Sequence, residues 1–323
     1  MTKINTAYDN IKSNNRKTAM LVVAFPMIFV VLVFFAIWIA ISATSAPDAG
    51  NIMPTVLSTT AMVAIPTAIA CLVWLLISWA FGDSMMLSAA GANEIHNDQP
   101  EYKQVFRSVE NVAIAAGLPM PRVYIIDDDS LNAFATGRTP NDASIALTRG
   151  IIAKLNRLEL EGVIAHEMAH IGNRDIRLDM LLITGVGVTV FTADIVARML
   201  FFGGGRDNDR DGKQAAAILL AVWIAFMIFN WIFVPILRMA ISRKREFAAD
   251  ATGAFITRNP RALADALRKI SVDPRVEVLD NRKTMAAVCI ADPRAKAALG
   301  EFVGGLYATH PPVAERIKRL ENM

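Results

Sequence analysis

Residues 166–170 read HEMAH, which places His166 and His170 four residues apart and Glu167 beside the first of them. On a helix, residues four apart lie on one face about one turn from each other, so both imidazoles can reach a single metal ion. Glu167 can then act as a general base on a water molecule at that ion. The chain has only four histidines in 323 residues, and a chance match is expected in roughly two of a thousand such chains.

The residues around this pattern predict the helix that it needs. Asn156 and Glu159 have the spacing of a capping box, in which each side chain bonds the backbone N–H of the other residue. Apolar residues at helical spacing follow them and predict a buried face: Leu160, Val163, Ile164 and Ile171. An ordinary amphipathic helix with two surface histidines is the less favoured alternative.

A catalytic zinc ion usually has three protein ligands and one open position, so the two histidines need a further partner. One known arrangement places Gly seven residues and His ten residues after the first histidine. The chain has Asn173 and Ile176 at those two positions, so this arrangement is excluded.

Three residues remain as candidates for the third ligand: Glu246, His310 and Asp175. Glu246 is preferred because Asp250 lies one helical turn after it and can accept the free N–H of a ligating imidazole. Without the upstream histidines, the same two acids would be interpreted as solvated groups beside a basic run.

The composition is more apolar than that of an average soluble protein, with 54% hydrophobic residues, 20% charged residues and a mean hydropathy of +0.38. The net charge of +3 is small, and no large basic block or basic patch with interleaved aromatics occurs, so nucleic acid is not an expected partner. Cys71 and Cys289 lie far apart, and Cys71 falls in an apolar run, so a disulfide framework is not expected.

Four apolar segments are long enough to cross a bilayer as helices: 20–41, 55–81, 180–202 and 215–237. The first has 22 residues and would extend about 33 Å, against a hydrocarbon core of about 30 Å. It is longer than the apolar core of a signal peptide, about 7–15 residues, so cleavage is not expected. Asp194 and Arg198 interrupt the third segment and can pair on one face, which leaves open whether that segment crosses fully.

The segments divide the chain into five parts: an N-terminal tail (1–19), a first transmembrane hairpin (20–81), a polar portion with the HExxH helix (82–179), a second hairpin (180–237) and a last polar portion (238–323). Strand character at 122–127 and 144–148 predicts a small sheet in the first polar portion. An extended substrate could pair along the second strand, Ser144, Ile145, Ala146, Leu147 and Thr148. That the strand lies in the sheet interior is an equal alternative.

Positive charge near the apolar segments predicts the topology. The tail carries four Lys or Arg residues and the first loop carries none, so the tail is expected in the cytoplasm. Two crossings then return each polar portion to that side, so both can form one catalytic domain. The basic residues after the last segment agree with this orientation: Arg238, Arg243, Lys244 and Arg245. Those in the second outer loop disagree with it: Arg206, Arg210 and Lys213.

These features resemble the HtpX-type membrane-bound zinc metallopeptidases, a family related to the prenyl-protein (CAAX) endopeptidases. The resemblance covers nearly the whole chain and includes LNAFATG at 131–137, HEMAH at 166–170, SRKREFAAD at 242–250, THPP at 309–312 and the two apolar hairpins. It implies a mainly α-helical integral membrane protein with four transmembrane helices in two hairpins. It also implies a cytoplasmic α+β zinc-metallopeptidase domain of the HExxH gluzincin type with a small sheet.

The resemblance further implies an endopeptidase of the prokaryotic inner membrane that degrades misfolded or damaged membrane proteins. The expected partners are polypeptide substrates and the lipid bilayer. One zinc ion is implied, bound by His166, His170 and Glu246, with Glu167 as general base. Substrate-binding or transition-state roles are implied for Asn132 and His310.

Two other functions are carried as alternatives. A prenyl-protein processing endopeptidase would share the same metal chemistry, and the sequence does not fix the substrate. A transporter or non-catalytic membrane scaffold is disfavoured because such proteins place polar groups inside the spans, whereas the reactive residues here lie in the polar portions.

Overall fold

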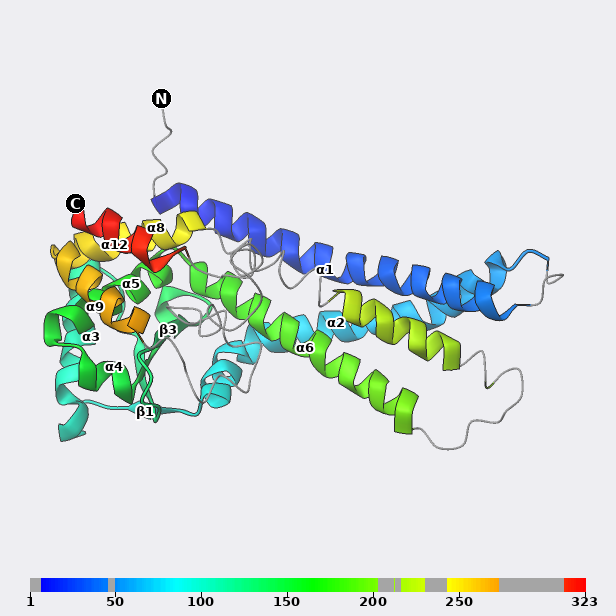
Figure 1. Ribbon diagram of the computed structural model, residues 1–323, viewed down its shortest axis with the longest axis horizontal. Coiled ribbons are helices and arrows are strands. Elements are labelled where there is room, and N and C mark those ends of the chain that lie inside the picture. The colour runs from blue at the N-terminus through cyan, green and yellow to red at the C-terminus, as the bar shows by residue number, and fades with distance from the viewer. Residues whose placement is uncertain (1–6, 46–49, 203–211, 213–215, 230–242, 273–310) are drawn as a thin grey trace, which may run out of the picture. The chain divides into compact units, whose positions relative to one another are not determined.

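The structure is a computed structural model that describes residues 7–45, 50–202, 212, 216–229, 243–272 and 311–323 (Figure 1). The chain divides into two compact units. The first contains the HExxH residues and is formed by residues 1–18, 81–184 and 237–323, and the second is formed by residues 19–80 and 185–236.

A four-stranded sheet lies in the first unit, in the order β1-β2-β4-β3. β1 pairs with β2 and β3 with β4 in antiparallel fashion, whereas β2 and β4 are parallel. The two strands predicted at 122–127 and 144–148 are confirmed as β2 and β4, and the sequence pattern did not predict the other two. The bounds are β1 Ala92–Ile95, β2 Arg122–Ile126, β3 Ala133–Thr136 and β4 Ser144–Thr148.

β4 has a paired strand on each side. Ile145, for example, lies opposite Val123 of β2 and opposite Ala135 of β3. All five residues of β4 are buried, and pairing occupies the backbone along both edges. The prediction that a substrate pairs along Ser144, Ile145, Ala146, Leu147 and Thr148 is therefore wrong, because the strand is a sheet interior. Within the described residues, β3 is an edge strand.

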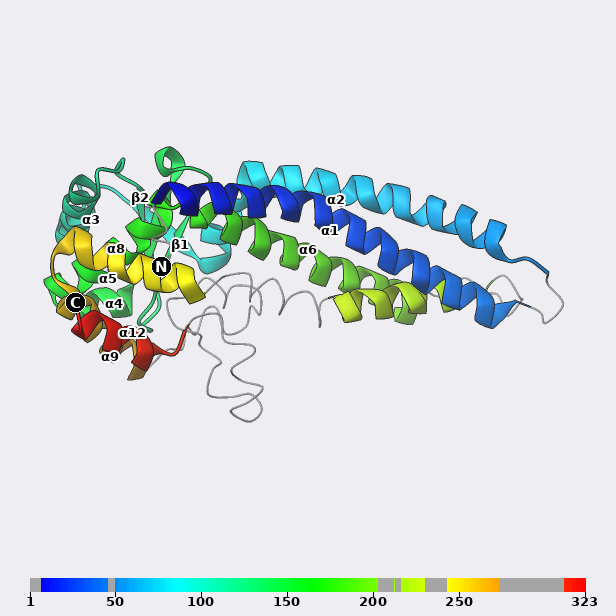
Figure 2. The same ribbon diagram turned by 90° about the horizontal axis from the view of Figure 1, so that it is seen from above.

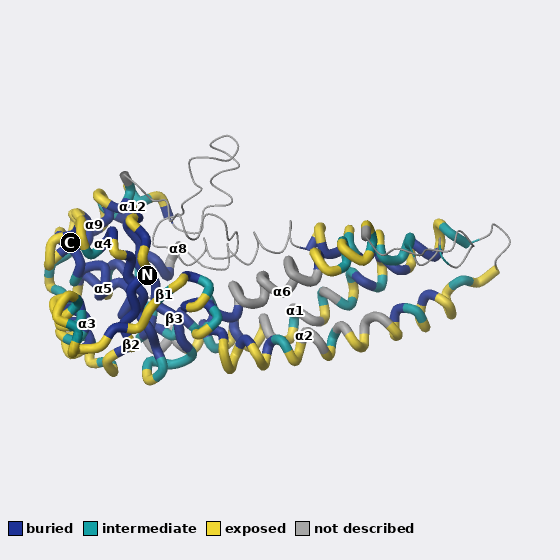
Figure 3. The backbone as a smooth tube through the Cα atoms, turned by 90° about the horizontal axis from the view of Figure 1, so that it is seen from below, coloured by how far each residue is buried: buried dark blue, intermediate teal, exposed yellow. Residues whose placement is uncertain are grey.

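Helices pack around this sheet, and α5 is the central one. It contacts α3, α8, α9 and β3, and Figure 3 shows it among the buried segments of this unit. In Figure 2, α9 and α12 lie side by side, in agreement with their contacts. The bounds are η1 Pro100–Tyr102, α3 Lys103–Ala116, η2 Pro140–Asp142, α4 Arg149–Lys154, α5 Arg157–Gly172, α8 Arg243–Thr257, α9 Pro260–Val272 and α12 Val313–Glu321.

The core of the first unit joins the sheet to these helices. Val109 of α3, Ile145 of β4, Ile164 of α5 and Leu267 of α9 belong to one apolar cluster, and each is at most 1% exposed. Burial of such a side chain stabilises the fold by about 1.5–3 kcal/mol. α5 is thereby held on several sides, which fixes the residues it carries.

The second unit contains the greater part of α1 and α2, much of α6 and the helical segment Ala216–Phe229. Its apolar core includes Val33, Ile37, Val56, Ala193 and Phe226. Among the described residues, Leu72–Ala90 is long and apolar enough to cross a membrane, and Val30–Thr44 and Ala216–Phe229 are shorter apolar helices. The full bounds of the long helices are α1 Ala7–Thr44, α2 Met53–Ala90 and α6 Asp175–Phe202.

These helices extend past the predicted apolar segments. α2 continues beyond residue 81 to Ala90, and Gly91 with a φ of +66° follows its end. α1 and α6 likewise begin before the apolar runs that they contain. The predicted pair in the third segment is confirmed, because Arg198 Nε lies 2.8 Å from Asp194 Oδ2.

Candidate metal centre

α5 begins at the predicted capping box. Asn156 Oδ1 accepts a hydrogen bond from the backbone N–H of Glu159 at 3.0 Å, and Glu159 Oε2 accepts one from the N–H of Asn156 at 2.8 Å. The predicted apolar face is buried, and so is every residue from Gly162 to Ala169. The helix therefore carries its two histidines within the core rather than on a solvated face.

α8 approaches α5 closely where Gly253 lacks a side chain. A Cβ atom at residue 253 would lie 3.0 Å from the backbone nitrogen of His166 and 3.2 Å from its Cα. Both are backbone atoms with little freedom to move. Glu246 and Asp250 lie seven and three residues before this glycine, so all three share one face of α8. The close approach thus brings both acids against the histidines of α5.

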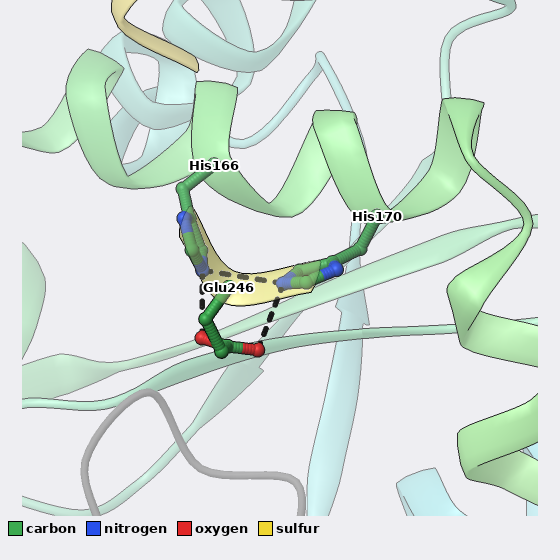
Figure 4. Close-up of side chains that lie close together, drawn as sticks. All are labelled: His166, His170 and Glu246. Carbon is green, nitrogen blue, oxygen red and sulfur yellow. Dashed lines mark hydrogen bonds and ion pairs between the residues drawn. The ribbon is translucent and has the colours of Figure 1, made fainter. Parts of the chain in front are cut away.

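His166, His170 and Glu246 converge on one point (Figure 4). The two Nε2 atoms are 3.2 Å apart. Glu246 Oε2 lies 3.7 Å from His166 Nε2, and Oε1 lies 3.5 Å from His170 Nε2. Two nitrogens bound to a tetrahedral zinc ion at about 2.0–2.1 Å would lie roughly 3.3 Å apart. The spacing of the nitrogens therefore suits zinc.

The outer nitrogen of each imidazole meets a carboxylate. His166 Nδ1 lies 3.0 Å from Asp250 Oδ1, and His170 Nδ1 lies 2.9 Å from Asp175 Oδ2. A carboxylate accepts hydrogen bonds, so in the neutral imidazoles each Nδ1 carries the proton and each Nε2 presents a lone pair. Two lone pairs 3.2 Å apart repel each other, and a cation between them removes the repulsion. The donor set therefore fits a metal ion.

A buried arginine supports each of these carboxylates. Arg316 of α12 donates to Asp250 at 2.8 and 2.7 Å. Arg245 of α8 donates to Asp175 Oδ1 at 3.3 Å and also to Asp179. Burial raises the pKa of Asp250, but Arg316 and His166 lower it to about 2, so the group is ionised.

The charges around His170 favour its protonated form in the absence of a competing cation. Burial lowers the pKa of the imidazole, but Asp175, Glu246 and Glu167 together raise it to about 10. The same negative charges that hold a proton there also favour a metal cation in its place.

Glu167 is buried close to His166 and His170. Burial raises the pKa of its carboxyl group, opposed in part by His166 and His170. The backbone amide of Ala135 in β3 also lowers the pKa of this carboxyl group. A carboxylate with a raised proton affinity is suited to general-base chemistry.

The other predicted site residues have different outcomes. Asp250 lies where predicted, against the Nδ1 atom of His166. Asn132 is buried directly before β3, where its Oδ1 accepts from the N–H of Ala133 at 2.8 Å and its own N–H donates to Thr148. His310 lies outside the described residues. The roles assigned to Asn132 and His310 stay predictions.

Three residues of the centre were missed or differently assigned from the sequence. Asp175 was a candidate ligand, but it contacts the outer nitrogen of His170. Arg245 was counted as a positive charge near the membrane, but its side chain is 9% exposed and lies among acids. Burial of Arg316 could have been predicted from the sequence, since it shares a helical face with Val313, Ile317 and Leu320.

The chain matches the model of peptidase family M48 over residues 99–323. It is 38% identical over 312 residues to a protease HtpX homolog of Bacteroides fragilis, covering 95% of this chain and 96% of that protein. It is 37% identical over 319 residues to one of Thermoanaerobacter pseudethanolicus, covering 98% of each. The crystal structure of S. mikatae Ste24p aligns at 15% identity with a TM-score of 0.46, over 95% of this chain and 64% of that longer one.

Proposed function

Because this chain belongs to peptidase family M48, we propose that it is an HtpX-type membrane-bound zinc endopeptidase that degrades misfolded or damaged membrane proteins. One observation carries the zinc assignment. The Nε2 atoms of His166 and His170 and the carboxylate of Glu246 converge, while Asp250 and Asp175 hold the two outer nitrogens.

Zinc would be held by His166, His170 and Glu246, and when bound it polarises the scissile carbonyl and lowers the pKa of water. Glu167 takes a proton from the attacking water and delivers it to the leaving amine. Its burial beside the ligands raises its pKa, which lets the carboxyl group hold the proton between the two steps.

The substrate would pair with β3 rather than with β4, the strand that the sequence predicted. β3 is an edge strand within the described residues and contacts α5, and the backbone amide of Ala135 on it lowers the pKa of Glu167. An extended peptide along this edge would pass the catalytic base with main-chain hydrogen bonds. Asn132 directly precedes the strand, which supports a role in binding the substrate or the developing oxyanion.

The membrane part of the proposal comprises four spans and a catalytic domain on the cytoplasmic side of the inner membrane. Its support is the four apolar segments and the basic N-terminal tail.

We expect Asp48→Cys and Asp209→Cys to be labelled from outside by an impermeant thiol reagent, in a background without Cys71 and Cys289. Ala308→Cys should stay unlabelled in intact cells, and its labelling would reverse the orientation.

The central experiment measures cleavage of casein and of an unfolded membrane protein by the purified full-length chain. Activity should disappear with a chelator and return with zinc. A prenylated peptide serves as the second substrate, because preferential cleavage of it would favour the processing alternative. A protein that binds zinc but cleaves none of the three substrates would favour the scaffold alternative.

A further inference from the structure

The beginning of α1 contacts the metal centre through Asn14. This side chain is 3% exposed, and its Nδ2 donates to Asp175 Oδ1 at 2.6 Å and to the backbone oxygen of Asn173 at 3.1 Å. The other oxygen of Asp175 lies 2.9 Å from His170 Nδ1. A continuous series of contacts therefore links the N-terminal segment to a proposed zinc ligand.

Local structure on both sides fixes this contact. Within α1, Thr18 Oγ1 donates to the backbone oxygen of Asn14 at 2.9 Å. On the other side, Arg174 has a φ of 58°, a left-handed conformation that separates α5 from α6. Asp175 then begins α6, only five residues after His170, and faces back toward the imidazole.

Asn14 and Arg245 have different effects on Asp175. Arg245 supplies positive charge, but its Nη1 lies 3.3 Å from Oδ1, which is a long hydrogen bond. Asn14 carries no charge, and its contact with the same oxygen is 0.7 Å shorter (3.3 − 2.6). Without the amide, the contact of Oδ1 with Arg245 is too long to hold the carboxylate, which can then turn away from His170.

We propose that Asn14 is a positioning residue of the metal centre, which holds Asp175 in the orientation that aims His170 Nε2 at the ion. The inference rests on the zinc function proposed above. The N-terminal segment then helps to position a metal ligand, whereas the sequence predicted only a tail before the first apolar segment.

Zinc affinity of the purified full-length protein, measured by competition with a chromophoric chelator, tests the proposal. Loss of a direct partner of a metal ligand typically weakens affinity 10–100-fold, so Asn14→Ala, one contact further away, should weaken it by about three- to tenfold. Asn15→Ala is the matched control, because Asn15 is the adjacent residue of the same type and accepts from Arg177 at 3.2 Å. It should bind zinc as the wild type does.

Asn14→Asp separates orientation from packing, because it keeps the size of the side chain. A second carboxylate against Asp175 repels it, so this variant should bind zinc more weakly than Asn14→Ala. The cobalt-substituted protein gives a second measure, since its visible absorption bands should change in Asn14→Ala and stay unchanged in Asn15→Ala. This spectrum reports the ligand geometry directly and does not depend on catalysis.

A double-mutant cycle with Asp175→Asn identifies the route of the effect. If Asn14 acts through Asp175, Asn14→Ala should weaken zinc binding far less in the Asp175→Asn background. Wild-type affinity in both Asn14 variants, or an undiminished effect in that background, would overturn the inference while leaving the proposed function intact. Absence of zinc binding by the wild type would instead overturn the proposed function.

Discussion

Arg316 forms two hydrogen bonds with Asp250, from Nε to Oδ2 at 2.8 Å and from Nη2 to Oδ1 at 2.7 Å. The arginine is fully buried, and Asp250 Oδ1 also lies 3.0 Å from His166 Nδ1. α12 is thus connected to a ligand on α5 through α8. The imidazole of His166 is oriented by a residue 150 positions later in the chain.

We expect Arg316→Met to destabilise the protein by about 3–5 kcal/mol, because it leaves the charge of Asp250 buried without its arginine. Thermal unfolding in detergent, with zinc content measured on the same samples, checks this. Arg319→Met is the matched control on the same helix. Its side chain is 53% exposed and pairs with Glu315, so its loss should cost less than about 1 kcal/mol. Equal melting temperatures for both variants would contradict the structural role of Arg316.

Glu167→Gln should keep the fold and the bound zinc but lower the cleavage rate by about 10²–10⁴-fold, since the amide cannot accept the proton of water. Casein cleavage and zinc content of the purified variant test this together. Glu161→Gln is the control, because that residue lies on the same helix and pairs with Arg157 near the surface. A wild-type rate in zinc-loaded Glu167→Gln would show that another group is the base.

The ligand assignment predicts an order of zinc contents. Glu246→Ala removes a ligand and should largely empty the site, whereas Asp250→Asn should lower the affinity by about 10–100-fold. His310→Ala should keep near-normal zinc while turning over more slowly. Metal analysis of the three purified variants gives the order directly. An empty site in His310→Ala with a filled site in Glu246→Ala would indicate a three-histidine centre.

Zinc binding should strengthen as the pH rises from 6 to 9. With a pKa of about 10, His170 holds a proton across this range, and zinc must displace it. Because the raised pKa depends on Asp175, Asp175→Asn should release fewer protons per zinc ion bound. Calorimetry in two buffers of different ionisation enthalpy counts these protons. Equal proton release by the wild type and Asp175→Asn would show that Asp175 does not raise the pKa of His170.

Local patterns in the sequence predicted local structure well. The capping box, the buried face of α5 and the strands at 122–127 and 144–148 depend on residues close together in the chain, and all are confirmed. The contact of Asp250 with an imidazole was predictable for the same reason, since Asp250 lies one helical turn from Glu246. α2 extends past the apolar segment 55–81, because loss of hydrophobicity and the end of a helix are separate events.

Contacts between distant residues could not be predicted in this way. Whether β4 has an open edge depends on β3, which folds back beside it, and no periodicity reports that pairing. Asp175 lies beyond a left-handed turn at Arg174, outside the helical spacing that connects the two histidines. Asn14 is 161 residues from its partner Asp175. Each of these positions is set by tertiary packing.

The close contact between α5 and α8 has a consequence for the order of biosynthesis. A ribosome completes the HExxH helix at Gly172, 74 residues before it reaches Glu246 (246 − 172). Until α8 has been made and docked at Gly253, the two imidazoles lack a third ligand and His166 lacks its carboxylate. We therefore expect hydrolysis to start only after α8 has left the ribosome, so that the nascent chain is not cleaved by its own active site during synthesis. A translation-arrested chain ending at Phe202 should retain no zinc, and stable zinc binding by it would refute this order.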